Sequence, residues 1–141
     1  MTSSTMKQIE VVAAILLRDK RVLGVQRGKN KFPYISRKYE FPGGKMEPGE
    51  SREEAVKREL EEELKMKIEV QKAFMTITHQ YPDFHLTMHT FLCTSQTPTV
   101  TLTEHINYQW LTSDQLSGLD WAEADLPIIE KLIADTDLEL L

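Results

Sequence analysis

A glycine-rich turn followed at once by a capped, carboxylate-rich helix constrains this chain more than any other feature. The turn spans residues 43–49, and Ser51 with Glu54 three residues later forms the capping box with which many helices begin. Residues 52–64 are mostly good helix formers and include neither Pro nor Gly. The stretch therefore predicts a loop and a helix joined at a fixed spacing.

The predicted helix carries an apolar face and an acidic face. The apolar stripe recurs every four residues, at Val56, Leu60 and Leu64. Glu59, Glu62 and Glu63 fall together on another face, where they repel one another unless a cation or an arginine neutralises them. Hard cations such as Mg²⁺ take oxygen ligands, usually a few carboxylates together with substrate phosphates. For an isolated acidic helix the alternative is a solvated surface.

The turn that precedes the helix favours the metal interpretation. Gly43 and Gly44 allow the backbone to approach a metal or a phosphate closely, and Lys45 adds a mobile positive charge. The chain has no Gly-x-x-x-x-Gly-Lys-Ser/Thr pattern, so this is not a Walker-type phosphate loop. Turn and helix together indicate a site for magnesium and a diphosphate.

At these residues the chain resembles the Nudix hydrolases, in their MutT-like branch. The family pattern is Gly, five residues, Glu, seven residues, and then Arg-Glu-aliphatic-any-Glu-Glu-any-Gly-aliphatic. The matching positions are Gly44, Glu50, Arg58, Glu59, Leu60, Glu62, Glu63 and Met66. Lys65 departs from the pattern, because the family usually has a glycine there that ends the helix in a left-handed conformation. The resemblance extends from about Ile9 to about Leu132.

The resemblance implies an α+β fold, the Nudix α/β/α sandwich, with a mixed β-sheet, the Nudix loop-helix and a C-terminal helix. We expect one domain over residues 1–141, with residues 1–6 flexible. Local patterns predict strands at 9–17, 22–26, 68–79, 85–94, 99–103 and 108–111, a helical turn at 113–116 and a last helix to about 134. Residues 28–38 are basic and read as a loop.

The resemblance also implies a metal centre, with Mg²⁺ as the ion and Mn²⁺ as the alternative. The implied ligands are the Gly44 carbonyl and the carboxylates of Glu59, Glu62 and Glu63, with Glu50 and Glu104 as further candidates. Helix-dipole stabilisation alone would also explain Glu50. Glu104 matches a segment that supplies an extra glutamate in many relatives, although in MutT that glutamate immediately precedes the tryptophan, where this chain has Gln109.

The residues carried over as catalytic are Glu59, Glu62, Arg58 and Lys45. Glu59 corresponds to a glutamate assigned as the base that activates water, although the base varies among family members. Arg58 is expected to pair with the acidic cluster and orient it. Lys45 is expected to position the phosphate or the nucleophile.

Three residues outside the motif are candidates for binding the nucleotide. Arg27 matches a phosphate-contacting arginine, with a solvent-facing arginine as the alternative. Phe41 lies near the base in similar pockets, with core packing as the alternative. Asp125 matches the position of a base-reading Asn, and an ionised Asp only accepts hydrogen bonds. The alternative for Asp125 is a helix cap.

The resemblance therefore predicts a magnesium-dependent nucleoside triphosphate pyrophosphohydrolase that releases the monophosphate and pyrophosphate. The candidate substrates are 8-oxo-dGTP, in nucleotide-pool sanitising, and CTP or dCTP. One alternative is hydrolysis of another nucleoside diphosphate derivative, such as ADP-ribose or a nucleotide sugar. Another is a nucleotide-sensing module without catalysis; such modules generally lose the motif carboxylates, which this chain keeps.

Composition limits the partners. The net charge of −5 argues against a general nucleic-acid binder, while a free nucleotide needs only a local basic pocket. Cys93 is the only cysteine, which excludes an intrachain disulfide and fits a reducing cytoplasm. No apolar stretch is long enough to span a membrane, and the four histidines lack zinc-site spacing. We expect a cytoplasmic monomer or homodimer that binds a small nucleotide.

Overall fold

The computed structural model describes residues 7–134, so the expected flexibility of residues 1–6 lies outside the described part of the chain. The elements in chain order are β1 (Lys7–Arg18), β2 (Arg21–Gln26), β3 (Tyr39–Glu40), β4 (Gly43–Lys45), α1 (Arg52–Leu64), β5 (Ile68–Gln80), β6 (Phe84–Ser95), β7 (Asn107–Leu111), two 3-10 helices at Ser113–Gly118 and Glu123–Asp125, and α2 (Leu126–Ala134). This order confirms the central helix and the strands predicted before and after it, apart from the one predicted at residues 99–103.

The strands form one mixed sheet in the order β3-β2-β1-β6-β5, with β4 added to β1 and β7 added to β2. Only β1 and β6 run parallel, and the other pairs are antiparallel. Residues 12–17 of β1 are all buried, because both faces of this central strand are covered. Asp19 and Lys20, both at positive φ (51° and 63°), make the tight turn into β2.

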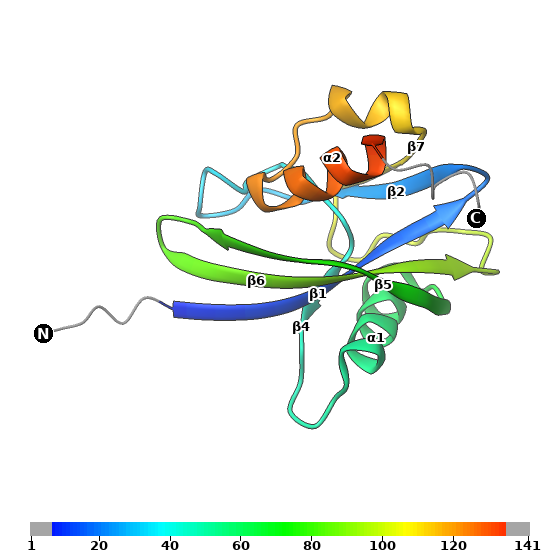
Figure 1. Ribbon diagram of the computed structural model, residues 1–141, viewed down its shortest axis with the longest axis horizontal. Coiled ribbons are helices and arrows are strands. Elements are labelled where there is room, and N and C mark those ends of the chain that lie inside the picture. Colours follow the sequence, from blue (N-terminus) through cyan, green and yellow to red (C-terminus); the bar gives the residue numbers. More distant parts are fainter. Residues whose placement is uncertain (1–6, 135–141) are drawn as a thin grey trace, which may run out of the picture.

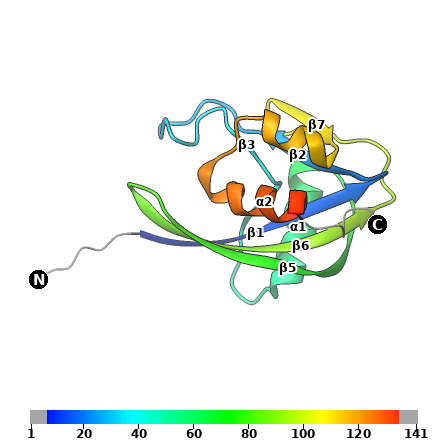
Figure 2. The same cartoon turned by 45° about the horizontal axis from the view of Figure 1, so that its top comes forward.

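Two helices cover opposite faces of the sheet, which confirms the predicted sandwich (Figures 1 and 2). The predicted stripe of α1 is fully buried in one hydrophobic cluster, between the helix and the sheet. Ile128, Ile129 and Leu132 of α2 are buried in a second cluster on the other face. Within residues 7–134, the structure has no helix with both the length and the apolar character needed to cross a bilayer.

The capping interactions at the two ends of α1 fix where the helix begins and where it ends. The Ser51 side chain accepts the Glu54 N–H, and the Glu54 carboxylate accepts the Ser51 N–H at 2.8 Å, so the predicted capping box is present. At the other end Lys65 adopts the left-handed conformation (φ 56°, ψ 39°) that the family pattern assigns to glycine. The helix therefore ends at the expected place, with a side chain that disfavours this conformation.

The strand predicted at residues 99–103 is wrong. Val100 and Leu102 do pack partly against the core, which explains the alternating pattern. The backbone instead turns to the end of α1, where the Thr101 N–H donates to the Leu64 carbonyl (3.1 Å) and the Thr103 hydroxyl donates to the Glu63 carbonyl (2.8 Å). This segment satisfies carbonyls at a helix end rather than those of a neighbouring strand.

Candidate active site

Gly44 and Glu59 meet where β4 passes beneath α1. Val12 of β1 pairs with Gly44, which holds the glycine backbone against the helix. A Cβ atom at residue 44 would lie 2.5 Å from Glu59 Oε2 and 2.7 Å from its Cδ. A side chain at residue 44 would therefore displace the Glu59 carboxylate, which now lies against the backbone of the turn.

Arg58 donates hydrogen bonds to several carboxylates of the acidic face. Its Nε donates to Glu50 Oε2 at 2.5 Å, and its Nη1 donates to both Glu59 and Glu62 at 3.0 Å. Its Nη2 donates to the carbonyl of Lys45, at 3.0 Å. The guanidinium thus fixes two predicted metal ligands against the glycine turn, and 21% of its side chain is exposed.

Glu50 is engaged by Arg58 rather than left open toward a metal. Both of its carboxylate oxygens accept from the guanidinium, and Oε1 also accepts the Glu47 N–H at 2.8 Å. Hydrogen bonding to Arg58, followed by that to Glu47, lowers the pKa of Glu50. We interpret Glu50 as the ionised anchor of Arg58, which supports the site from one step further out.

Glu63 carries the clearest sign that a cation belongs here. Its Oε1 is buried and has no hydrogen-bond partner among the described residues. Burial raises the pKa of Glu63 to about 7, and burial also raises the pKa of Glu59 despite the neighbouring Arg58. The charge of Glu104 also contributes to both shifts.

These features fit a divalent metal ion. An orphaned carboxylate oxygen and two destabilised carboxylates next to a backbone carbonyl are the donor set that a hard cation satisfies. Across residues 7–134, no group of three or more His, Cys, Asp or Glu side chains is arranged so that it could hold a metal ion. The assembly of the predicted ligands into a metal site therefore stays a prediction.

A pocket of about 750 Å³ connects the glycine turn to the interior. Five of its lining residues are basic, namely Lys7, Arg27, Lys29, Lys31 and Lys45, against three acidic ones, Glu40, Asp83 and Asp125. Gly44 lines the same pocket, as do the deeper Phe41 and Asp125. A chain with a net charge of −5 therefore has a locally basic cavity, which suits a polyphosphate.

Arg27 follows β2 and lies in this pocket, paired with Glu40. Its Nη2 donates to Glu40 Oε1 at 2.9 Å. Glu40 also contacts His105, whose Nε2 lies 3.0 Å from Glu40 Oε2. Burial alone would raise the pKa of Glu40, but the hydrogen bonds and charges of His105 and Arg27 together lower it.

Phe41 both packs in the core and lines the pocket, so the structure is compatible with both roles considered for it. The ring is 3% exposed and stacks on Trp121, with centroids 5.0 Å apart. Phe41 also lines the pocket. Core packing thus fixes the ring at the cavity wall.

Asp125 differs from its predicted state. Its side chain is buried. Its Oδ1 accepts the N–H of Phe41 at 3.2 Å, although the two residues lie far apart in the sequence. Burial, followed by the charge of Glu40, raises the pKa of Asp125 well above its usual value. Asp125 therefore takes up a proton more readily than a free Asp, and a protonated carboxyl group donates a hydrogen bond as well as accepting one.

Sequence reasoning missed Glu40 and His105 as parts of the site. Only 6% of the His105 side chain is exposed, and the lack of zinc-site spacing among the histidines gives no sign of this burial. The available signal was position, since Glu40 immediately precedes Phe41 and His105 follows the candidate ligand Glu104. Their mutual contact spans 65 residues of sequence, and no local pattern reveals it.

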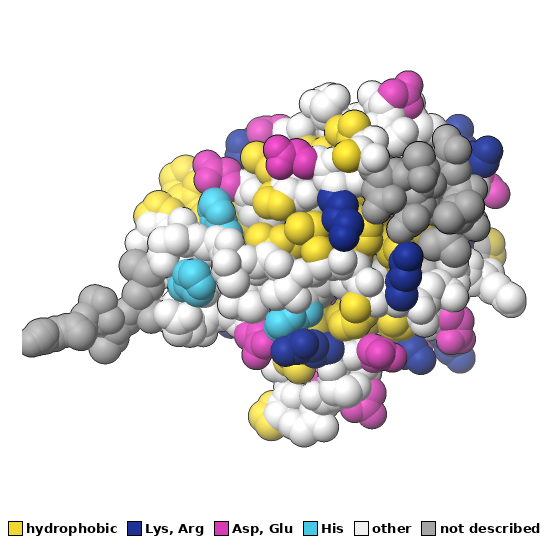
Figure 3. Space-filling view, in the orientation of Figure 1, with side chains coloured by type: hydrophobic (Ala, Val, Ile, Leu, Met, Phe, Trp, Pro, Cys, Tyr) yellow, Lys and Arg dark blue, Asp and Glu magenta, His cyan; other side chains and the backbone are white. Residues whose placement is uncertain are grey.

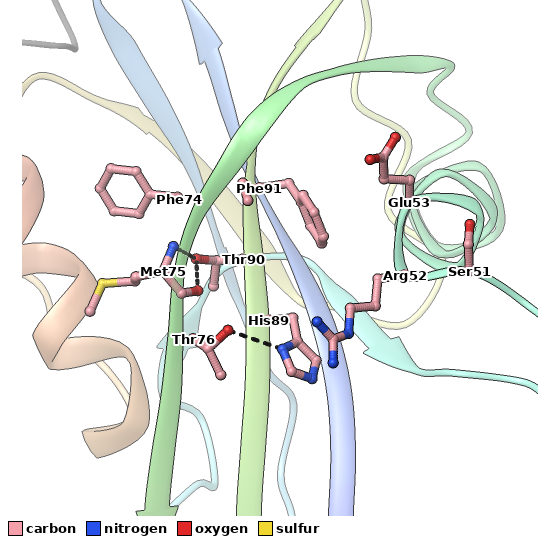
Figure 4. A pocket seen from close by; sticks show the side chains of 10 residues that line it. Ser51, Arg52, Glu53, Phe74, Met75, Thr76, His89, Thr90 and Phe91 are labelled. Carbon is pink, nitrogen blue, oxygen red and sulfur yellow. Dashed lines mark hydrogen bonds between the residues drawn. The ribbon is translucent and has the colours of Figure 1, made fainter.

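A second cavity, of about 540 Å³, lies between the start of α1 and strands β5 and β6 (Figure 4). It is lined by none of the predicted site residues. His89 is held there by Thr76 (3.0 Å) and by Glu10 (2.6 Å).

Figure 3 shows acidic and basic side chains intermixed over this view of the surface, without a continuous patch of one sign.

The profile of the NUDIX domain matches residues 6–132. This chain belongs to the NUDIX family. An Escherichia coli protein named CTP pyrophosphohydrolase is 33% identical over 129 residues, which cover 92% of this Nudix chain and 94% of the relative. The E. coli 8-oxo-dGTP diphosphatase is 29% identical over 127 residues, covering 90% and 98%.

The solved structures agree on the fold. The crystal structure of a MutT protein from Methanosarcina mazei matches with a TM-score of 0.82, at 24% identity, over 92% of this chain and 96% of that one. This likeness shows the Nudix fold. The protein is therefore a Nudix hydrolase of the MutT-like branch, as its sequence motif predicted.

Proposed function

We propose that this Nudix hydrolase is a magnesium-dependent pyrophosphohydrolase that converts a nucleoside triphosphate into the monophosphate and pyrophosphate. The observation that carries the proposal is the basic pocket, because it joins the turn of Gly44 and Lys45 to the buried Phe41 and Asp125. A polyphosphate and a base therefore have complementary surroundings within one cavity. The names of the two E. coli relatives support the same class of substrate.

A role is proposed for each site residue. We propose that Glu59, Glu62 and Glu63 hold Mg²⁺ with the Gly44 carbonyl, and that Glu104 adds a ligand from the facing loop. Bound magnesium supplies neutralisation of phosphate charge. Mn²⁺ has similar ligand preferences and is expected to replace it.

Side chains of the protein position the water, the phosphates and the base. Glu59 accepts the proton of the attacking water as the bond between two phosphates breaks, and Arg58 keeps that carboxylate in place. Lys45 and Arg27 line the pocket as cations for the phosphate oxygens. Phe41 presents its ring and Asp125 its carboxyl group to the base.

A substrate panel with magnesium tests the proposal: 8-oxo-dGTP, dGTP, CTP, dCTP, 5-methyl-dCTP, ADP-ribose and a nucleotide sugar. We expect release of pyrophosphate from 8-oxo-dGTP or a cytidine triphosphate, and loss of turnover by orders of magnitude in Glu59→Gln. An absence of turnover for every compound would reject the enzymatic proposal. A preference for ADP-ribose would reject the triphosphate assignment.

The expected cell compartment and assembly belong to the same proposal. Cys93 is buried, and burial raises the pKa of its thiol to about 12, so it behaves as an inert core residue in a reducing cytoplasm. We expect the protein to be a monomer or a homodimer.

A further inference from the structure

Arg27, Glu40 and His105 form a continuous chain of contacts at the wall of the nucleotide pocket. Arg27 Nη2 donates to one oxygen of Glu40 at 2.9 Å, and His105 Nε2 lies 3.0 Å from the other. Arg27 and Glu40 line the pocket, while His105 stands behind them with 6% of its side chain exposed. The histidine therefore reaches the pocket only through Glu40.

The chemistry of Glu40 determines how His105 must be protonated. A carboxylate that receives the Arg27 guanidinium offers only lone pairs to its second neighbour, so His105 Nε2 carries a hydrogen and donates. In the neutral ring this leaves Nδ1 as a bare acceptor. Nδ1 is buried and has no partner among the described residues.

The backbone on both sides of His105 is tied to the two halves of the site. Thr103 donates its hydroxyl to the carbonyl of Glu63, at the end of the acidic helix. The Ile106 N–H donates to the carbonyl of Gln26, the residue before Arg27, at 2.9 Å. His105 thus lies on a short bridge between the helix that carries the metal ligands and the strand that leads to Arg27.

We propose that His105 is a positioning residue for nucleotide binding, which holds Glu40 and, through it, Arg27 in place while the bridge keeps both in register with the acidic helix. The inference rests on the proposed function, because the bound species is the nucleotide. His105 does not touch the substrate. Its removal frees Glu40 and Arg27 to adopt other side-chain conformations, so binding weakens while bond breaking at saturation is unchanged.

Two amide variants of different reach separate this role from a general packing role. The amide nitrogen of Gln in His105→Gln extends to about the position of Nε2, whereas that of Asn in His105→Asn stops near Nδ1. We therefore expect His105→Asn to raise KM for the best triphosphate about tenfold with kcat within about twofold, and His105→Gln to restore most of the affinity.

Binding measured without turnover separates this inference from the proposed function. Titration calorimetry with the nucleoside monophosphate, in metal-free buffer, should show the same order: wild type and His105→Gln tight, His105→Asn weaker by about tenfold. His85→Asn is the matched control, because His85 lies outside the pocket and contacts Gln80. It should bind as the wild type does.

Three results would overturn the role of His105. They are equal impairment of both amide variants, a fall in kcat with KM unchanged, and unaltered binding in a folded His105→Asn. Melting curves establish folding, and if His105→Asn melts early, His105→Leu tests the same loss of the donor. A wild-type protein that binds the monophosphate but cleaves no triphosphate would reject the proposed function and leave this inference standing.

Discussion

Gly44 lies directly against the Glu59 carboxylate. A side chain at residue 44 would occupy the volume that this carboxylate now fills, with Cβ 2.5 Å from Oε2. The turn and the helix are therefore not two separate parts of the site. The smallest residue of the turn defines where the candidate base of the helix lies, and Arg58 holds that carboxylate from its other side at 3.0 Å.

Gly44→Ala is expected to displace Glu59 and to reduce kcat by about 100-fold, since a shift of about 1 Å in a reacting group has that effect. Gly118→Ala is the matched control, because nothing lies within 4 Å of a Cβ at residue 118. Steady-state kinetics and a melting curve measure both variants. Normal turnover in Gly44→Ala would show that the Glu59 position is not critical.

Arg58→Lys keeps the charge and loses the planar fork that contacts Glu50, Glu59 and Glu62. We expect activity and apparent Mg²⁺ affinity to fall about 10–100-fold, as for residues that orient metal ligands. Arg52→Lys, on the same helix, should change neither, because the Arg52 side chain is 55% exposed and lies 4.0 Å from Glu10. Magnesium titrations of turnover compare the two variants.

Glu63 predicts a pH-dependent instability of the metal-free protein. Burial raises its pKa to about 7, so its contribution to stability is fully present below the unfolded value near 4.5 and is lost as pH rises to about 7. Glu63→Gln does not titrate and should exceed the wild type in stability above pH 7, by on the order of 2 kcal/mol.

Denaturant unfolding in chelator at pH 4.5 and pH 8 measures that difference. It should be small at the lower pH and large at the higher one. Magnesium should remove the deficit of the wild type at pH 8. A constant difference between the two proteins would contradict the buried, unpaired state of Glu63.

Lys65→Gly is expected to stabilise the protein by about 1 kcal/mol, because Lys65 holds a left-handed conformation that glycine adopts without steric cost. Lys65→Ala removes the same charge but keeps Cβ, so it should not stabilise. Thermal unfolding distinguishes the two explanations, and kcat should be unchanged in both variants. Equal stabilisation by both would assign the effect to charge.

Asp125→Asn keeps an acceptor for the Phe41 N–H and removes the cost of a buried ionisable group. Because burial raises the pKa of Asp125, the wild type loses stability as pH rises above about 4, the usual Asp value, and the Asn variant does not. We expect the Asn variant to be the more stable at pH 8. Asp125→Ala, which leaves the Phe41 N–H unpaired, should be less stable than Asp125→Asn by about 1–3 kcal/mol.

The predictions from sequence succeeded where the information is local. The capping box of Ser51 and the apolar stripe of α1 both depend on residues within a few positions of one another. The strand predicted at 99–103 failed because Val100 and Leu102 alternate like strand residues, while their backbone partners are the carbonyls at the end of α1.

Sequence alone determined the family, the loop and helix that carry the carboxylates, and the class of reaction they indicate. Tertiary structure alone decided that Asp125 is buried against Phe41, that Glu63 keeps an unpaired oxygen, and that Glu40 joins Arg27 to His105. The physical reason is that helix periodicity and capping follow from neighbouring residues. Burial and long-range hydrogen bonds, by contrast, depend on which distant segments the sheet brings into contact.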